Sequence, residues 1–107
     1  METNAAVAIK ALGDPTRRQI FELVARGPVS VGAIAQQVPV SRPAVSQHLK
    51  VLKEAELVID RADGTRRLYE MNPDGLETLR SYFERFWNSA LWAFKRAAEQ
   101  AANKEGK

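Results

Sequence analysis

The chain has 107 residues, of which 45% are hydrophobic, so it is long enough for one domain with a modest core and too short for two. It contains no cysteine, which excludes a disulfide framework and any thiolate metal or redox site. The formal net charge of +3 is mildly favourable to a nucleic-acid partner, although many proteins without one are as basic. No stretch reaches the length of a transmembrane helix and the first residues lack a secretory signal, so we expect a cytoplasmic protein with no membrane partner.

Three short helices are predicted in the first third of the chain, each with its own start signal. Short polar side chains can accept hydrogen bonds from the unpaired backbone N–H groups of a first helical turn, and glycine or proline ends a helix. These signals predict helices over residues 5–12, 15–25 and 31–37, capped by Thr3 or Asn4, by Asp14, and by Ser30.

A fourth helix, over residues 42–54 and here called the reading helix, has two faces of different chemistry. Ser41 can cap it, and Pro43 lies in the first turn, where a missing N–H costs no hydrogen bond. Apolar residues recur at helical spacing on the face expected to pack inward, while the opposite face carries donors suited to phosphates and base edges. The inward residues are Val45, Leu49 and Leu52, and the outward ones include Arg42, Ser46, Gln47 and Lys50.

A polar helix face is most often only solvated, so the neighbouring sequence decides the interpretation. The helices over residues 31–37 and 42–54 are separated by about four residues, the spacing of a helix-turn-helix motif. Pro39 stands in this turn, where such motifs often have glycine, and should stiffen it. The motif favours a helix that reads nucleic acid over a merely solvated surface.

A β-hairpin is predicted after the reading helix. Residues 57–62 and 65–71 flank Asp63 and Gly64, a dipeptide that favours a two-residue type I′ turn. With that turn, Arg61 would lie opposite Arg66, and Asp60 opposite Arg67 in an ordinary surface ion pair. The two arginines would be held together by an external anion or spread apart into water, and the sequence leaves both open.

Asn72 and Pro73 start a long C-terminal helix, predicted over residues 73–103 and roughly 45 Å in length. An apolar stripe follows this helix, and the domain's core can cover only its first two turns. The rest is covered either by a second copy of the chain or by folding back over its own domain. We expect a dimer, with an interface formed by Phe83, Phe86, Trp87, Ala90 and Phe94. Trp92 lies off the stripe, as a second contact, a ligand surface or simply an exposed aromatic.

A helix-turn-helix followed by a charged hairpin predicts a winged helix-turn-helix, mainly α-helical with a β-hairpin wing. We expect residues 1–107 to form this single domain, with about five helices and two antiparallel strands. Its most distinctive stretches are residues 14–18 (DPTRR), residues 46–52 (SQHLKVL) and the hairpin's Gly64 with Tyr69. In these stretches the chain resembles the ArsR-type (ArsR/SmtB superfamily) bacterial transcriptional repressors, closely over residues 9–71 and more loosely in the C-terminal helix.

The resemblance implies a homodimer that binds double-stranded operator DNA and blocks transcription until a signal releases it. The reading helix would enter the major groove, and the wing would lie on the backbone or in the minor groove. Two-fold symmetry implies an operator that is an inverted repeat. Carried over by position, the DNA contacts would be Arg42, Ser46, Gln47 and Lys50 in the helix and Arg61, Arg66 and Arg67 in the wing.

The chain lacks the residues by which metal-sensing members of this family bind their signal. The helix over residues 31–37 has no thiolate, and His48, inside the reading helix, is the one histidine in the sequence. We therefore expect no metal site and no cofactor, and interpret His48 as a packing or capping residue at the margin of the buried face. The inducing signal is left open as a small molecule, a protein or none.

An enzyme is excluded because its usual parts are missing: there is no cysteine, one histidine, no glycine-rich phosphate loop and no H-E-x-x-H pair. The alternative to a DNA-binding regulator is a winged-helix module that binds a protein or RNA partner. Salt dependence separates these functions, because binding to DNA phosphates releases counterions. The operator sequence, the genes controlled and any activating role are not encoded in these patterns.

Overall fold

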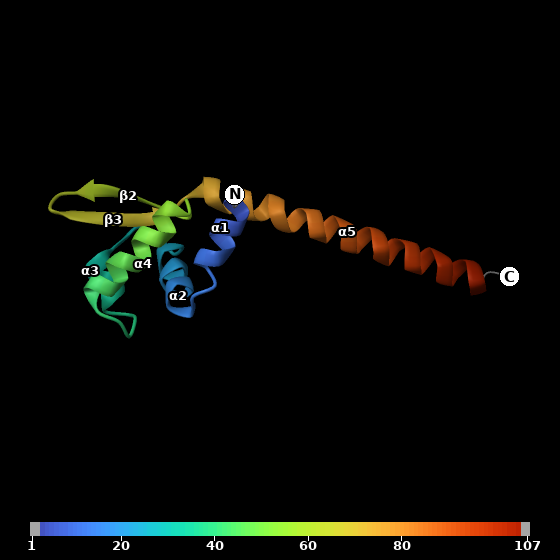
Figure 1. The fold of residues 1–107 in the computed structure, drawn as a ribbon, viewed down its shortest axis with the longest axis horizontal. Helices are drawn as coiled ribbons and strands as arrows, with labels where there is room; N and C mark the ends of the chain where they lie inside the picture. Colours follow the sequence, from blue (N-terminus) through green and yellow to red (C-terminus); the bar gives the residue numbers. More distant parts are fainter. Residues whose placement is uncertain (1–2, 106–107) are drawn as a thin grey trace.

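The computed structural model describes residues 3–105, which form five helices and three strands (Figure 1). Along the chain these are α1 (Asn4–Ala11), α2 (Pro15–Val24), β1 (Val29–Ser30), α3 (Val31–Ala35), α4 (Arg42–Glu54), β2 (Val58–Asp63), β3 (Arg66–Met71) and α5 (Pro73–Glu105). The bounds of the reading helix, α4, are those predicted from the sequence. The helix-turn-helix of α3 and α4 and the β2–β3 wing confirm the predicted winged helix-turn-helix.

The helix starts follow the capping residues. The side-chain oxygens of Thr3, Asp14, Ser30 and Ser41 each accept a hydrogen bond from a backbone N–H two or three residues ahead, at 2.8 to 3.3 Å. The N–H of Arg17 donates to Asp14, and this hydrogen bond is the main reason that the pKa of the Asp14 carboxyl lies below its ordinary value. Local chemistry therefore fixes where α1 to α4 begin.

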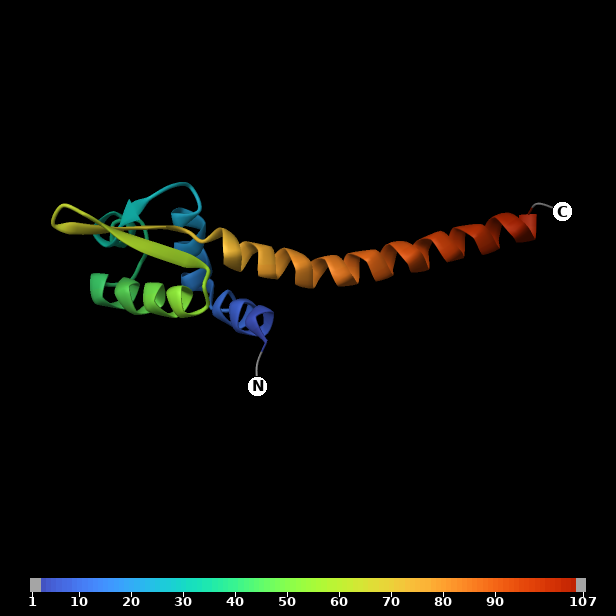
Figure 2. The same ribbon diagram turned by 90° about the horizontal axis from the view of Figure 1, so that it is seen from above.

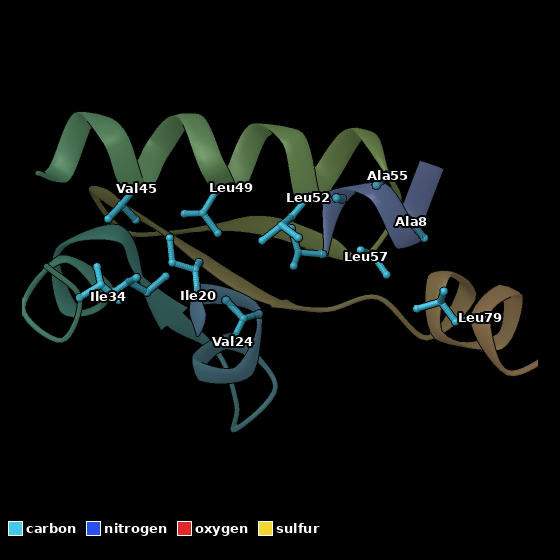
Figure 3. Packing of buried hydrophobic residues seen from close by; sticks show 13 residues of the cluster. Ala8, Ile20, Val24, Ile34, Val45, Leu49, Leu52, Ala55, Leu57 and Leu79 are labelled. Atoms are coloured by element: carbon cyan, nitrogen blue, oxygen red, sulfur yellow. The ribbon is translucent and has the colours of Figure 1, made fainter. Parts of the chain in front are cut away.

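The hydrophobic core lies between α4 and the helices and sheet packed beneath it (Figure 3). The inward face of α4 contributes Val45, Leu49 and Leu52, all of them 0% exposed as the periodicity predicted. Burying one such side chain stabilises the fold by about 1.5–3 kcal/mol. The other large side chains that are fully buried are Ile20, Val24, Ile34, Leu57 and Val58.

The sheet has three antiparallel strands in the order β1-β3-β2, one strand more than expected. The added strand, β1, places Val29 opposite Tyr69 and Ser30 opposite Leu68. Two residues are too few to show the alternation by which strands are recognised in a sequence. β1 forms because the wing's inner strand offers it a hydrogen-bonding edge, and it anchors the wing to the start of α3.

The predicted register of the wing was wrong by two residues. Asp63 pairs with Arg66, so the loop consists of Gly64 and Thr65, and Arg61 lies opposite Leu68. Of the two loop residues only Gly64 has a positive φ, +64°, as in a type II′ turn with glycine at its first central position. Asp63 therefore stays in the strand, and the expected cross-strand pairing of Arg61 with Arg66 does not occur.

The end of α4 lies close to the start of α5. Glu56 adopts a left-handed φ of +62°, and the N–H of Leu57 donates to the carbonyl oxygen of Leu52 at 2.9 Å, which closes α4 with a Schellman motif. A Cβ placed on Gly75 would lie 2.8 Å from the carbonyl carbon of Glu56 and would clash with its oxygen. Glycine at position 75 thus permits the backbone of α5 to approach this turn.

We expect Gly75→Ala to lower the free energy of unfolding by about 1–3 kcal/mol, because the added methyl group must displace backbone atoms. Helix propensity alone would favour alanine here by about 1 kcal/mol. A decrease in the free energy of unfolding would therefore show that the close approach of the two backbones outweighs helix propensity. Urea unfolding at fixed protein concentration measures the change. Ser89→Ala, an exposed substitution in the same helix, is the control, and a Gly75→Ala protein more stable than wild type would contradict this account.

Helix α5 leaves the domain after its first turns and gives the molecule its length of 73 Å (Figures 1 and 2). Its beginning packs against α1, where Leu79 is 9% exposed. From residue 83 to residue 104 every side chain is exposed, so the alternative in which the helix folds back over its own domain is wrong for the single chain. Within residues 3–105, no helix combines the length and the apolar character needed to cross a membrane.

Candidate nucleic-acid interface

The outward face of α4 presents polar side chains that are held in place by the buried face behind them. Arg42, Ser46, Gln47 and Lys50 are all exposed, and their spacing places them on one side of the helix. Within residues 3–105, no hydrogen bond or ion pair engages these four side chains. Their donors are therefore available to a ligand, on a helix whose opposite face is fixed in the core.

A groove of about 340 Å³ separates this face from the wing. The guanidinium of Arg42 lies against the first turn of α3, with its Nη1 atom 3.5 Å from the point that a Cβ on Gly32 would occupy. Three guanidinium groups around one groove create a positive potential that favours phosphate. The lining residues are Ser30, Val31, Arg42, Ser46, Thr65, Arg66, Arg67 and Tyr69.

The structure thus brings four of the seven predicted contacts together from two separate elements: Arg42, Ser46, Arg66 and Arg67. Gln47 and Lys50 extend the same face of α4 beyond the groove, and Arg61 lies outside it on β2. Ser30 and Thr65 line the groove but were not selected from the sequence. Ser30 had been recognised only as a helix cap, and Thr65 enters because the loop is shifted by one residue.

Each arginine of the wing faces a carboxylate of the same hairpin. Arg61 Nε lies 3.4 Å from Glu70, Arg66 Nη2 lies 3.1 Å from Asp63, and Arg67 Nε lies 2.7 Å from Asp60. More than half of each arginine side chain is exposed, so the pairs orient the guanidinium groups without removing them from an incoming phosphate. Exposed pairs of this kind contribute little to stability.

Asp60 differs from the other wing carboxylates because it joins two elements. Its side chain is only 7% exposed, and its two oxygens lie 2.7 Å from Lys53 Nζ and 2.7 Å from Arg67 Nε. The hydrogen bond from Lys53, followed by that from Arg67, lowers the pKa of the Asp60 carboxyl below its ordinary value. The predicted pair of Asp60 with Arg67 is therefore present, but it is not an ordinary surface pair, because Asp60 also ties the last turn of the reading helix to the wing.

We expect Asp60→Asn to lower the free energy of unfolding at pH 7 by about 1–3 kcal/mol, because the negative charge is lost and the amide has one acceptor oxygen for two cationic donors. Since the pKa of Asp60 is lowered by folding, its contribution is fully present above the unfolded pKa of about 3.9 and is lost as the pH falls through the folded value. Urea unfolding across this pH range should show the two proteins converging in acid. The matched control is Asp63→Asn, at an exposed pair, and an equal effect there would contradict the role of Asp60.

The other residues selected from the sequence, namely His48, the predicted interface residues and Trp92, lie outside the groove. His48 is half-buried on α4, and within residues 3–105 no group of three or more histidine and carboxylate side chains is arranged to hold a metal ion. The predicted interface residues lie on the projecting part of α5, which extends away from the wing (Figure 1). Trp92 is 64% exposed, with Lys95 Nζ 5.3 Å from its ring centre.

Comparison with known proteins places this geometry in a family. Residues 12–61 match a family described as a helix-turn-helix domain. The HTH-type transcriptional regulator Rv2034 of Mycobacterium tuberculosis is 58% identical to this chain over 87 residues, which are 81% of each protein.

Two solved structures share both the fold and part of the sequence. An ArsR-like transcriptional regulator from Rhodococcus sp. RHA1 is 31% identical with a TM-score of 0.73, over 89% of this chain and 92% of that one. The homodimeric winged helix-turn-helix DNA-binding domain Mb0332 from Mycobacterium bovis is 30% identical with a TM-score of 0.65, over 79% of both chains. With the reading helix, groove and wing described above, these similarities show that the chain belongs to the ArsR-type family of winged helix-turn-helix, DNA-binding transcriptional regulators, which are not enzymes.

Proposed function

We propose that the protein is a homodimeric repressor that binds an inverted-repeat operator and acts in the cytoplasm. The observation that carries the proposal is the unengaged donor face of α4, which lies beside a groove lined by three arginines. Such a face suits the major groove, where base edges present acceptors, and the arginine-lined groove suits the adjoining phosphates.

The side chains divide into two roles. Arg42 and Gln47 read base edges, because a guanidinium matches guanine and a carboxamide matches adenine. Ser46 and Lys50 on the helix, and the wing arginines at positions 61, 66 and 67, hold the phosphate backbone. The carboxylates that pair with the wing arginines keep them extended until phosphate oxygens replace them.

The dimer follows from the apolar stripe on α5. Phe83, Phe86, Trp87 and Phe94 are 56%, 55%, 65% and 74% exposed, which leaves roughly 100 Å² of each ring in water. Two such stripes would bury roughly 800 Å² together, a stabilisation on the order of 20 kcal/mol before the costs of association. The homodimeric Mb0332 domain, which has the same fold, supports this assembly. A two-fold axis would place the two reading helices on half-sites about 10 base pairs apart.

The test begins with selection of bound genomic fragments, followed by fluorescence anisotropy on the selected site at several salt concentrations. If Lys50 and the three wing arginines each meet one phosphate, a dimer makes about eight contacts, and log Kd should rise with log salt with a slope of about 7. A protein partner would give a far smaller salt dependence. Selection of no DNA, or anisotropy that shows tighter binding to single-stranded RNA than to the selected duplex, would overturn the proposal.

We also expect stoichiometric zinc, cadmium or arsenite to leave operator affinity unchanged. The chain has no cysteine and one histidine, so it cannot provide the ligand sets that these ions need. The same anisotropy titration, run with and without each ion, measures the effect. A metal-dependent loss of affinity of about tenfold, or about 1.4 kcal/mol, would contradict this expectation and point to a site shared between subunits.

A further inference from the structure

A second groove, of about 310 Å³, lies between α1, α2 and α4 and shares no residue with the groove beside the wing. Helices α1 and α4 form its two walls, and Arg17 enters from the first turn of α2. Its volume falls at the lower end of the range for small-molecule sites. The lining residues are Val7, Lys10, Ala11, Arg17, Val51, Glu54 and Ala55.

Arg17 brings a partly exposed guanidinium to the groove. Its side chain is 17% exposed, and its Nη2 atom lies 3.6 Å from Asp14, which anchors one edge of the guanidinium. Its buried Nε atom has no acceptor within the described chain. What the groove meets is the exposed 17% of the Arg17 side chain, which brings a cation to its lining.

The walls add a charge and an apolar surface. Lys10 brings a second cation to the groove, while Glu54 brings one carboxylate on the opposite wall. Val51 is 37% exposed, although the other branched apolar residues of α4 are buried completely. A valine that packs neither in the core nor among the DNA-facing residues gives this groove an apolar side.

We propose that this groove binds a small carboxylate with an apolar body. The carboxylate accepts hydrogen bonds from Arg17 and Lys10, and the apolar body lies against Val7 and Val51. A bare inorganic anion would leave the apolar walls uncovered, and a neutral apolar molecule would give Lys10 and Arg17 no hydrogen-bond acceptor. Charge and apolar surface together therefore specify an amphipathic anion.

The site has a further consequence that rests on the proposed function. A ligand held between α1 and α4 touches both the helix that packs on α5 and the helix that reads DNA. A ligand that favours one relative position of these two helices is linked to operator affinity, and such linkage is reciprocal. Binding of the carboxylate alone does not depend on that linkage, so the two can be measured separately.

The test is an NMR titration of the full chain, without DNA, using hexanoate, hexan-1-ol and inorganic phosphate as probes. We expect saturable binding of hexanoate with a Kd of about 1 mM or tighter, with amide shifts in the walls of the groove. Hexan-1-ol and phosphate should each bind at least about tenfold more weakly. Lys10→Gln should weaken hexanoate about tenfold, and Val51→Glu, which adds a carboxylate to the groove, should abolish binding.

Lys104→Gln, an exposed change near the end of α5, is the matched control and should leave hexanoate binding unaltered. Equal affinity for hexanoate and hexan-1-ol, shifts confined to α5, or no saturation at all would overturn the proposal. So would protection of the groove amides by dimer formation, because a second copy of the chain would then be the occupant. A protein that binds hexanoate but no operator would overturn the proposed function and leave this site standing.

Discussion

Phe86→Glu combined with Phe94→Glu should yield a monomer whose binding to operator DNA is weak and salt-sensitive, with a smaller salt slope than that of the dimer because fewer phosphates are met. The two rings are 55% and 74% exposed in the single chain, so the substitutions remove little packing beyond the edge-to-face contact of Phe86 with Tyr82, one turn earlier on the same helix. At an interface they would remove two aromatic anchors and force carboxylates into apolar surroundings, which costs several kcal/mol. With one reading helix per molecule, the second half-site no longer contributes to affinity.

Sedimentation at micromolar concentration and operator titration measure the two parts of this prediction. Trp92→Glu is the matched control, because Trp92 is 64% exposed on the same helix but lies off the stripe. A wild-type protein that sediments as a monomer, or a double variant with full operator affinity, would contradict the dimer. An equal effect of Trp92→Glu would place the interface on the other face of α5.

The second large effect concerns sequence preference. We expect Arg42→Ala and Gln47→Ala each to reduce discrimination between operator and scrambled duplex by about 1–3 kcal/mol, at one base pair of each half-site. Arg66→Ala should weaken binding to both duplexes by a similar factor, because phosphate contacts carry little sequence information. Paired titrations on the two duplexes separate these outcomes.

Gln100→Ala, on the exposed part of α5, serves as the control for removing a carboxamide and should leave the affinity for both duplexes unchanged. If Arg66→Ala altered discrimination while Gln47→Ala did not, the wing would be the reading element. The proposed orientation on DNA would then be inverted.

The features that the sequence predicted well are those determined by neighbouring residues. Thr3, Asp14, Ser30 and Ser41 cap their helices because the accepting oxygen and the donating N–H are two or three residues apart. The inward face of α4 and the extent of α5 follow from apolar residues at helical spacing, which no distant contact overrides.

The features that were missed are those that the local sequence pattern leaves undetermined. β1 exists only because β3 provides its partner, and two residues carry no pattern of their own. The wing register turned on whether Asp63 or Gly64 began the loop, and both choices satisfy a two-residue turn. The contact between Lys53 and Asp60 depends on how α4 lies over β2, which helical spacing does not determine.

The projecting part of α5 also bears on how the chain becomes ordered. From residue 83 to residue 104 no side chain is buried, so only local helix propensity holds these residues in shape within a single chain. Most of the stability of a helix in a protein comes from packing of its apolar face, which this segment lacks in a single chain. When the dimer dissociates on dilution, the helix content measured by circular dichroism should therefore fall as well. Assembly is then coupled to folding, and its apparent affinity includes the cost of ordering about six helical turns.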